Sequence, residues 1–294
     1  MILAPLRGVT IRCFRETFAD EIRAAGFTEA VTPFITANAG YDPLKDRELQ
    51  KCSNVRMFEC SNADRIKITP QFIGKDPEAL RVCLEKVKAA GYDTADLNCG
   101  CPYPMVRNKG RGSGILRTPD VLRRMLEVGC EVMGPGKFSI KARLGVDRND
   151  ELLKLMPTIN EFPLRFLTVH ARTARQMYEG SCDGEMVEKV SKVSKVSIVI
   201  NGDIPFPLPS SLFPFPSSLM IGRSFVRYLG TREDSGELLS RYIAASQKEL
   251  CGDRPVLGRM KELIAYWKDL PRWRRRWDVI KLCRTVDELK SCLI

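Results

Sequence analysis

The sequence predicts a fold of the α/β class, a (β/α)8 TIM barrel followed by a small all-helical domain, and three observations carry this prediction. Over the first 230 residues or so, short apolar or β-branched runs ending in Gly, Pro or Asn alternate with helical patterns. Eight such runs occur, which is the strand number of a parallel barrel joined by helical crossovers. Beyond about Thr231 the pattern is purely helical. We therefore expect a barrel over 1–231 and a helical domain over 232–294.

The expected strands are short and bounded by turn residues. They cover 1–5, 28–34, 66–72, 94–100, 138–143, 166–171, 197–202 and 218–222. Two of the crossover helices have clear start signals, because Asp76 and Thr118 each place a capping side chain before a proline at the first helical position.

The crossover after the seventh strand is different, because 204–218 contains five prolines, and we expect an irregular or shortened element there. The C-terminal helices are expected over 235–249, 255–268, 271–283 and 286–293.

The net charge of +11, from 47 Lys and Arg against 36 Asp and Glu, favours a polyanionic partner such as nucleic acid. The densest basic run is "PRWRRRWD" at 271–278, where arginines alternate with Trp273 and Trp277. One interpretation is a solvated helix face whose tryptophans pack on the core. The other is a surface that contacts phosphates and bases. The run alone does not decide between them.

The eleven cysteines are scattered without a C-x-x-C pair, and the chain has a single histidine, so a zinc site of Cys and His ligands is not expected. The sequence shows no cationic segment followed by an apolar one, so a secretory signal is not expected. The long uncharged stretch 204–221 carries five prolines and cannot form a membrane helix. We expect a cytoplasmic monomer with reduced thiols and neither a metal nor a membrane partner.

Polar and ionisable residues gather at the predicted strand ends, where a barrel places its functional groups. Packing alone would favour Val, Ile and Leu there. Glycines at the ends of strands seven and eight, together with a neighbouring arginine, are typical of a phosphate site. The strand-end residues are Ala4, Pro5, Leu6, Gln71, Asn98, Cys101, Lys141, Arg143, His170, Arg172, Asn201, Gly202, Asp203, Gly222 and Arg223.

The segment "DLNCGCPYPMVRNKGRGSGIL" at 96–116 contains two cysteines one residue apart. Since Pro102 ends the strand, we expect Cys101 to begin the loop and reach into the site, while Cys99 stays in the barrel wall as a small apolar residue.

Several of these blocks resemble the tRNA-dihydrouridine synthases. "APLRGVTIRCFR" is similar to the family's A-P-M-x-G-V-T-D-x-x-F-R opening, with Leu6 in place of the usual Met. "DLNCGCP" resembles its N-x-G-C-P signature, and "KARLG", "VHART", "INGDI" and "MIGRS" follow in the family's order. The tryptophan that the family carries soon after Gly180 is lacking here.

The resemblance implies an FMN-bound barrel with a helical tRNA-binding domain that uses NADPH to reduce uridine in tRNA to 5,6-dihydrouridine. Reduced flavin would give a hydride to C6 of uracil, and Cys101 would act as general acid toward C5. Asn98 and Arg172 would contact the uridine, which must be flipped out of the tRNA elbow. The glycine-rich cationic loop after Cys101 is then expected to be mobile and to close over the flipped base. FMN would meet Ala4, Pro5, Leu6, Gln71, Lys141, His170, Asn201, Gly202, Asp203, Gly222 and Arg223.

Two other classes stay open from the sequence. One is an RNA-binding protein built on a decayed barrel, against which the intact polar strand ends argue. The other is an FMN barrel that acts on a free pyrimidine, such as a dihydroorotate or dihydropyrimidine dehydrogenase, and those barrels lack a basic helical tail.

Overall fold

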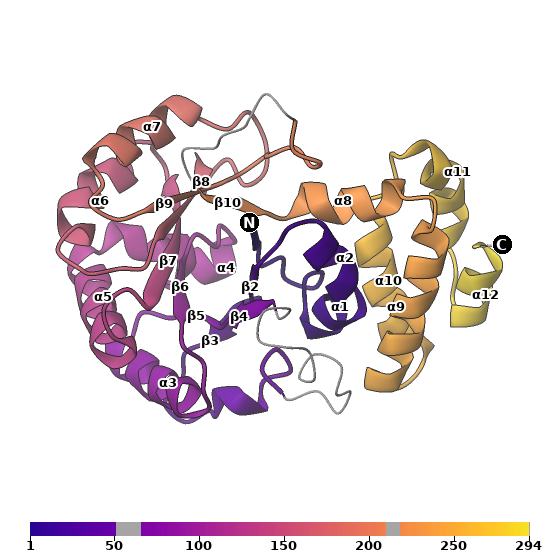
Figure 1. Ribbon diagram of the computed structural model, residues 1–294, viewed down its shortest axis with the longest axis horizontal. Helices are drawn as coiled ribbons and strands as arrows, with labels where there is room; N and C mark the ends of the chain where they lie inside the picture. Colours follow the sequence, from indigo (N-terminus) through magenta and orange to yellow (C-terminus); the bar gives the residue numbers. More distant parts are fainter. Residues whose placement is uncertain (51–65, 210–217, 294) are drawn as a thin grey trace.

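The computed structural model describes residues 1–50, 66–209 and 218–293 (Figure 1). In this part of the chain, ten short strands pair in parallel in the order β3-β5-β6-β7-β8-β9-β10-β1-β2-β4. Their bounds are β1 Ile2–Leu3, β2 Glu29–Val31, β3 Ile35–Thr36, β4 Lys67–Thr69, β5 Gln71–Ile73, β6 Ala95–Cys99, β7 Phe138–Gly145, β8 Leu167–Thr173, β9 Ile198–Asn201 and β10 Ser218–Ile221.

The ten strands are eight barrel strands, two of which are interrupted. Pro33 lies between β2 and β3, and Pro70 between β4 and β5, and proline cannot donate to a sheet ladder. Pairing continues across the interruption, because the Thr32 N–H donates to the carbonyl oxygen of Thr69 at 3.0 Å. Since β2 pairs with β4 and β3 pairs with β5, both ends of the strand order belong to the same two strands and the barrel closes. The predicted barrel of eight strands is confirmed.

Helices α3, α5, α6 and α7 cover the outside of the barrel, as Figure 1 shows. The Asp76 cap is confirmed, because its carboxylate accepts the Glu78 N–H at 3.0 Å. The Thr118 cap is wrong: a 3-10 turn ends directly before it, and its hydroxyl donates instead to the Ile115 carbonyl at 3.1 Å. The barrel helices are α1 Arg12–Thr17, α2 Ala19–Ala24, η1 Pro43–Lys45, α3 Pro77–Ala89, α4 Pro104–Arg107, η4 Gly112–Arg117, α5 Pro119–Met133, α6 Glu151–Ile159, α7 Gly184–Val193 and α8 Arg223–Thr231.

The proline-rich crossover contains no helix over 204–209, as expected, and its remaining part at 210–217 lies outside the described residues.

Four further helices follow α8, at the positions that the sequence predicted to within a few residues. They are α9 Ser235–Glu249, α10 Asp253–Ile264, α11 Pro271–Ile280 and α12 Val286–Ser291. Their treatment as a separate domain stays a prediction. No helix among the described residues has the length and apolar character needed to cross a bilayer.

The C-terminal helices pack on α1 and α2 through one continuous cluster of buried apolar side chains. Tyr242 of α9 packs on the adjacent rings of Phe14 in α1 and Phe18 at the α1–α2 junction, with ring centroids 6.0 and 5.4 Å away. Two buried tryptophans complete the cluster: the Trp267 indole donates to the Val226 carbonyl at 2.7 Å, and the neighbouring Trp273 donates back to α8. Burial of large aromatic surfaces makes this contact strongly stabilising.

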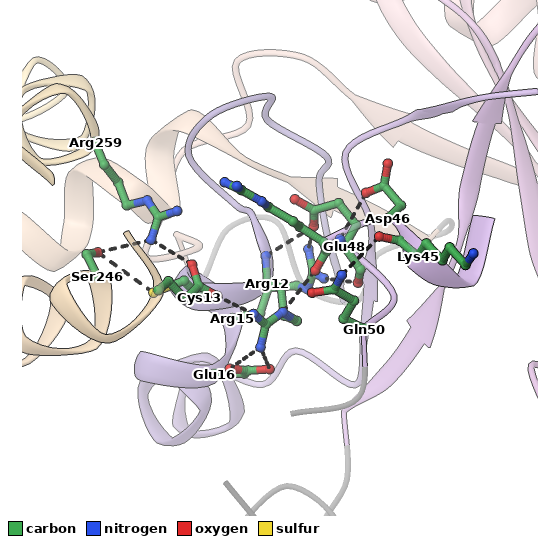
Figure 2. A network of polar contacts seen from close by, with 12 residues as sticks. Arg12, Cys13, Arg15, Glu16, Lys45, Asp46, Glu48, Gln50, Ser246 and Arg259 are labelled. Carbon is green, nitrogen blue, oxygen red and sulfur yellow. Dashed lines mark hydrogen bonds and ion pairs between the residues drawn. The ribbon is translucent and has the colours of Figure 1, made fainter. Parts of the chain in front are cut away.

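A polar network joins the same elements at the edge of this cluster (Figure 2). Arg12 of α1 forms an ion pair with Glu249 of α9, which also accepts from Arg259 of α10 at 2.8 Å. Arg15, buried beneath it, donates to Glu48 at 2.8 Å. Burial raises the pKa of Glu48, while the Arg15 charge opposes this rise. The network ties the C-terminal helices to the first barrel helix and to the segment before residue 50.

Candidate active site

A cavity of about 770 Å³ opens at the carboxyl ends of the barrel strands, a volume within the usual range of ligand pockets. The structure brings most of the sequence-predicted site residues together on its wall. These are Ala4, Pro5, Leu6, Asn98, Cys101, Lys141, His170, Asn201, Gly202, Asp203, Gly222 and Arg223.

Two predicted residues, Gln71 and Arg172, are buried and do not line this cavity. Gln71 lies behind Asn98 and accepts a hydrogen bond from its amide at 2.8 Å. Arg172 lies behind Asp203 and donates to the Gly180 carbonyl at 2.6 Å. Both support residues that do face the cavity, and their direct contacts with a ligand stay predictions.

Cys101 is the second residue after β6, and its backbone is fixed on both sides. The Asn98 side-chain oxygen accepts the Gly100 N–H at 3.1 Å and the Cys101 N–H at 2.8 Å. The Cys101 carbonyl accepts from the Ser113 hydroxyl at 2.9 Å. Cys99, as predicted, is fully buried in the strand.

The glycine-rich segment after Cys101 is not the open loop that the sequence suggested. Pro104–Arg107 forms α4, and Gly112–Arg117 forms a 3-10 helix whose first five residues are buried. Gly112 has φ +57°, and a Cβ there would lie 2.7 Å from the Cys101 Cβ. The glycine is therefore needed for close packing on Cys101. The mobility of this glycine-rich cationic segment and its closure over a flipped base stay predictions.

Burial raises the pKa of the Cys101 thiol, while Arg7 and Arg143 oppose this rise. The thiol is therefore protonated at neutral pH and can donate a proton. Arg143, which the sequence placed at a strand end without a role, donates to the Gly100 carbonyl at 3.0 Å and to the Met177 carbonyl at 2.7 Å. Burial lowers the pKa of Arg143 to about 10, which leaves it charged.

Lys141 enters the cavity from β7, and no described residue forms a hydrogen bond or ion pair with its ammonium group. Burial lowers the pKa of Lys141 to about 7, helped by Arg143 and opposed by Asp96. An unpaired cation in such a place is costly unless a ligand provides a partner. Burial also lowers the pKa of His170, with the Lys141 and Arg143 charges adding to the effect, so the imidazole is neutral at physiological pH.

The residues of the predicted anion site lie together at the ends of β9 and β10, and their binding of an anion stays a prediction. Asp203, at φ +46°, accepts hydrogen bonds from Arg172 and, at 2.6 Å, from Arg223. These hydrogen bonds, led by that of Arg172, lower the pKa of Asp203. Two cations and one carboxylate leave a net positive charge of one. At Gly202, a Cβ would lie 2.7 Å from the His170 ring and 2.8 Å from Cys182 Sγ, so only glycine allows the backbone to pack this closely on these side chains.

Sequence reasoning missed a group of lining residues contributed by loops, by α8 and by α10 with the turn that follows it. Arg7 lies in a block that the sequence singled out, and Tyr178 follows the "VHART" block. Glu262 and its neighbours had only a helical pattern, which does not reveal which face meets the barrel. The missed residues are Arg7, Phe34, Tyr103, Tyr178, Arg227, Glu262, Ala265, Tyr266 and Asp269.

Comparison of the chain with known proteins gives a consistent picture. A model of the dihydrouridine synthase (Dus) family matches residues 2–210. The tRNA-dihydrouridine synthase B of Vibrio vulnificus is 26% identical over 227 residues, which cover 76% of this chain and 66% of that protein. The tRNA-dihydrouridine synthase B of Serratia marcescens is 24% identical over 277 residues, covering 91% of this chain and 78% of that protein. The chain thus matches just under two thirds of the Vibrio vulnificus relative.

Among solved structures, the old yellow enzyme homologue from Zymomonas mobilis (NCR) superposes with a TM-score of 0.55 at 12% identity, covering 77% of this chain and 85% of that one. Morphinone reductase gives a TM-score of 0.53 at 11% identity, covering 77% and 82%. These similarities concern the fold. Because the family match spans most of the barrel and includes the Cys101 segment, the chain belongs to the dihydrouridine synthase family.

Proposed function

We propose that this chain is an FMN-dependent tRNA-dihydrouridine synthase that reduces uridine to 5,6-dihydrouridine at the expense of NADPH. The single observation that carries the proposal is the position of Cys101. Its protonated thiol lies on the wall of a cationic cavity large enough for a cofactor and a base, and its backbone is fixed by Asn98. The family relatives named tRNA-dihydrouridine synthase support the same activity.

The residues present fit FMN. The unpaired Lys141 ammonium offers a positive charge for the electron-rich end of a flavin. A Cβ would lie 2.7 Å from the His170 ring at Gly202 and 3.0 Å from the Ala4 Cβ at Gly222, so glycine lets the backbone pack closely at both strand ends. Gly222 precedes α8, so a phosphate there would meet the N-terminus of that helix and the Arg223 guanidinium. Further contacts would come from Pro5, Leu6, Asn201 and Asp203 on the wall, and from Gln71 behind it.

A bound flavin reduced by NADPH would provide the hydride chemistry for C6 of uracil. Cys101 then donates its Sγ proton to C5, which completes the addition of two hydrogens across the C5–C6 bond. Asn98 orients the base, and neutral His170 and the Lys141 amine provide a fixed polar environment in the cavity. Arg172 contributes to uridine binding through Asp203, which it holds in place. Solvent regenerates the thiol.

The basic C-terminal helices would hold the tRNA. Arg274 and Arg275 of α11 are exposed and have no partner among the described residues, whereas Trp273 between them and α8 is buried. Both interpretations of the arginine-rich run therefore apply: the tryptophan packs on the core, and the free arginines offer phosphate contacts. Such contacts would offset the free-energy cost of unstacking the flipped uridine.

The decisive experiment maps dihydrouridine in tRNA from cells with and without this protein, and repeats the reaction with purified protein, FMN, NADPH and unmodified tRNA. Cys101→Ala should bind FMN and tRNA like the wild type but lose product formation. Wild-type rates for this variant would refute the assignment of the acid. Colourless protein that binds tRNA would favour an RNA-binding role, and turnover of free uracil would favour a pyrimidine dehydrogenase.

A further inference from the structure

Beneath the cavity, the side chains of three polar residues on the adjacent strands β5 and β6 form a chain of hydrogen bonds that ends at the backbone N–H of Cys101. The Gln71 amide nitrogen donates to Asp96 Oδ2 at 2.7 Å, and the Asn98 amide nitrogen donates to the Gln71 oxygen at 2.8 Å. The Asn98 oxygen in turn accepts the Cys101 N–H at 2.8 Å. Asp96 and Gln71 are both fully buried. Nothing in the proposed chemistry uses the Asp96 carboxylate.

The hydrogen bonds of this series all run in one donor-to-acceptor direction, which the groups at its two ends determine. At the far end, an ionised carboxylate can only accept, so Gln71 must turn its NH2 group toward Asp96. Its oxygen therefore faces Asn98, which must present its own NH2 group. At the near end, the backbone N–H of Cys101 can only donate, which requires the Asn98 oxygen. Both ends thus demand the same orientation of the two amides.

A reversed Gln71 would break this chain at two places at once. Its oxygen would face the Asp96 carboxylate, and its NH2 group would face the NH2 group of Asn98. Buried polar groups without partners are costly, so this arrangement is disfavoured as long as Asp96 accepts. With the chain intact, Asn98 also keeps one N–H without a partner among the described residues, on the wall of the cavity.

Asp96 itself is held firmly. Its second oxygen accepts the Ser139 hydroxyl at 2.6 Å, and Ser139 is fully buried on the neighbouring strand β7. Burial raises the pKa of Asp96 to about 6, while the bonds from Ser139 and Gln71 and the charge of Lys141 oppose this rise. The carboxylate is therefore ionised at neutral pH.

We propose that Asp96 is a positioning residue for Cys101, which fixes the orientation of the Gln71 and Asn98 amides and through them the backbone of the cysteine. Its effect on the rate rests on the proposed function of Cys101 as proton donor. Its effect on the geometry of the thiol does not, and can be measured without catalysis.

The test compares Asp96→Asn, Asp96→Leu and Gln71→Met in the purified full chain. Asparagine keeps an acceptor toward Gln71 and can donate to Ser139. It should therefore preserve the series of hydrogen bonds while removing the negative charge of the carboxylate. Leucine removes the acceptor at similar size, and Gln71→Met interrupts the chain at its next member. Ser139→Ala is the control, because it removes a bond to Asp96 but leaves the acceptor for Gln71.

The first readout is the rate at which iodoacetamide alkylates Cys101, followed on its own peptide by mass spectrometry across pH. The thiol is only 7% exposed, so loss of its anchor should speed alkylation several-fold and shift its pH profile in Asp96→Leu and Gln71→Met. Product formation in a single turnover should fall about tenfold or more in the same two variants. Asp96→Asn and Ser139→Ala should stay close to the wild type in both measurements.

The double variant Asp96→Leu/Gln71→Met should be no worse than Gln71→Met alone, because both act through one chain. Wild-type alkylation in Gln71→Met would overturn the proposal, as would an Asp96→Asn variant as impaired as Asp96→Leu. If Asp96→Leu fails to fold, the alkylation rates of Gln71→Met and Asp96→Asn still test the positioning role. A full rate in Cys101→Ala with altered alkylation in Gln71→Met would reject the proposed acid while keeping the positioning role.

Discussion

The guanidinium of Arg143 lies 5.3 Å from the centre of the Tyr178 ring and holds that ring at the wall of the cavity. Arg223 lies over the same ring at 4.8 Å. Since Arg143 also bonds to the Gly100 carbonyl, one buried cation connects the cysteine segment after β6 with the segment after β8. The two segments that flank the proposed site are therefore held together by Arg143. We expect substitutions in either segment to alter the position of Cys101.

Replacement of Gly112 by alanine should disturb Cys101 directly. The new Cβ would lie 2.7 Å from the Cys101 Cβ, and the residue has φ +57°. We expect product formation to fall about tenfold or more, with a loss of stability on the order of 1–3 kcal/mol. Gly110→Ala is the matched control, since it has φ +73° but its nearest neighbour is the Lys75 side chain at 3.4 Å. Steady-state rates and urea unfolding would check both, and equal activity of the two variants would contradict the packing argument.

Lys141 should make the stability of the flavin-free protein rise with pH. The pKa of Lys141 is lowered from 10.5 to about 7, so between these values the unfolded chain binds more protons than the folded one. The contribution of Lys141 to stability should therefore increase from pH 7 toward pH 10, by at most about 1.4 kcal/mol per pH unit, against the opposite contribution of buried thiols such as Cys101, whose pKa is raised. Urea unfolding at pH 7 and pH 9 measures this slope. Lys141→Met should lose it, and the exposed Lys154→Met should retain it; equal slopes in all three proteins would disprove the assignment.

Arg172 and Arg223 both pair with the Asp203 carboxylate, but their replacement should affect different properties of the protein. Arg172 is buried and also holds the Glu179 and Gly180 carbonyls, so Arg172→Ala should destabilise the fold by about 3–5 kcal/mol. Arg223 is half-buried on the cavity wall. Arg223→Ala should change stability little and weaken FMN binding about tenfold or more. Chemical denaturation and flavin fluorescence titration separate the two effects, and a reversed pattern would exchange the roles we assign.

Removal of Arg274 and Arg275 together should weaken tRNA binding without loss of stability, because both are exposed and have no partner in the described part of the chain. The slope of log K against log salt should become shallower by up to about two, one unit for each phosphate that is no longer neutralised. Filter binding at several salt concentrations would measure it. The double variant Arg81→Ala/Arg123→Ala is the control, since these arginines on α3 and α5 already pair with neighbouring glutamates. An unchanged slope would remove the C-terminal run from the tRNA interface.

The sequence predicted the barrel well because its signals are local. Each strand is an apolar run with a turn residue after it, and each helix start depends on a few neighbours. The Thr118 cap failed because its hydroxyl had a second acceptor, the Ile115 carbonyl, that only the preceding 3-10 turn creates. The interruptions at Pro33 and Pro70 were visible as prolines, but their pairing across strands was not.

In the site, too, local signals predicted some residues, whereas tertiary packing determined the others. The strand-end rule located Lys141 and His170, because parallel strands must end on one face. It could not distinguish a residue on the cavity wall from one behind it, so it did not reveal that Gln71 lies beneath Asn98, and the contact of Gln71 with the cofactor stays a prediction. Glu262 was missed because the face that α10 turns toward the barrel depends on tertiary packing.

The cluster shared by the first and last helices has a consequence for the newly made chain. Phe14 and Phe18 emerge from the ribosome early, but their partner Tyr242 and the two buried tryptophans are synthesised more than 200 residues later. Until then, part of the apolar surface of α1 and α2 is uncovered and prone to aggregation. A truncation that removes α9–α12 would leave the same surface exposed permanently. Stable burial of the apolar surface of α1 and α2 therefore requires that α9–α12 have been synthesised.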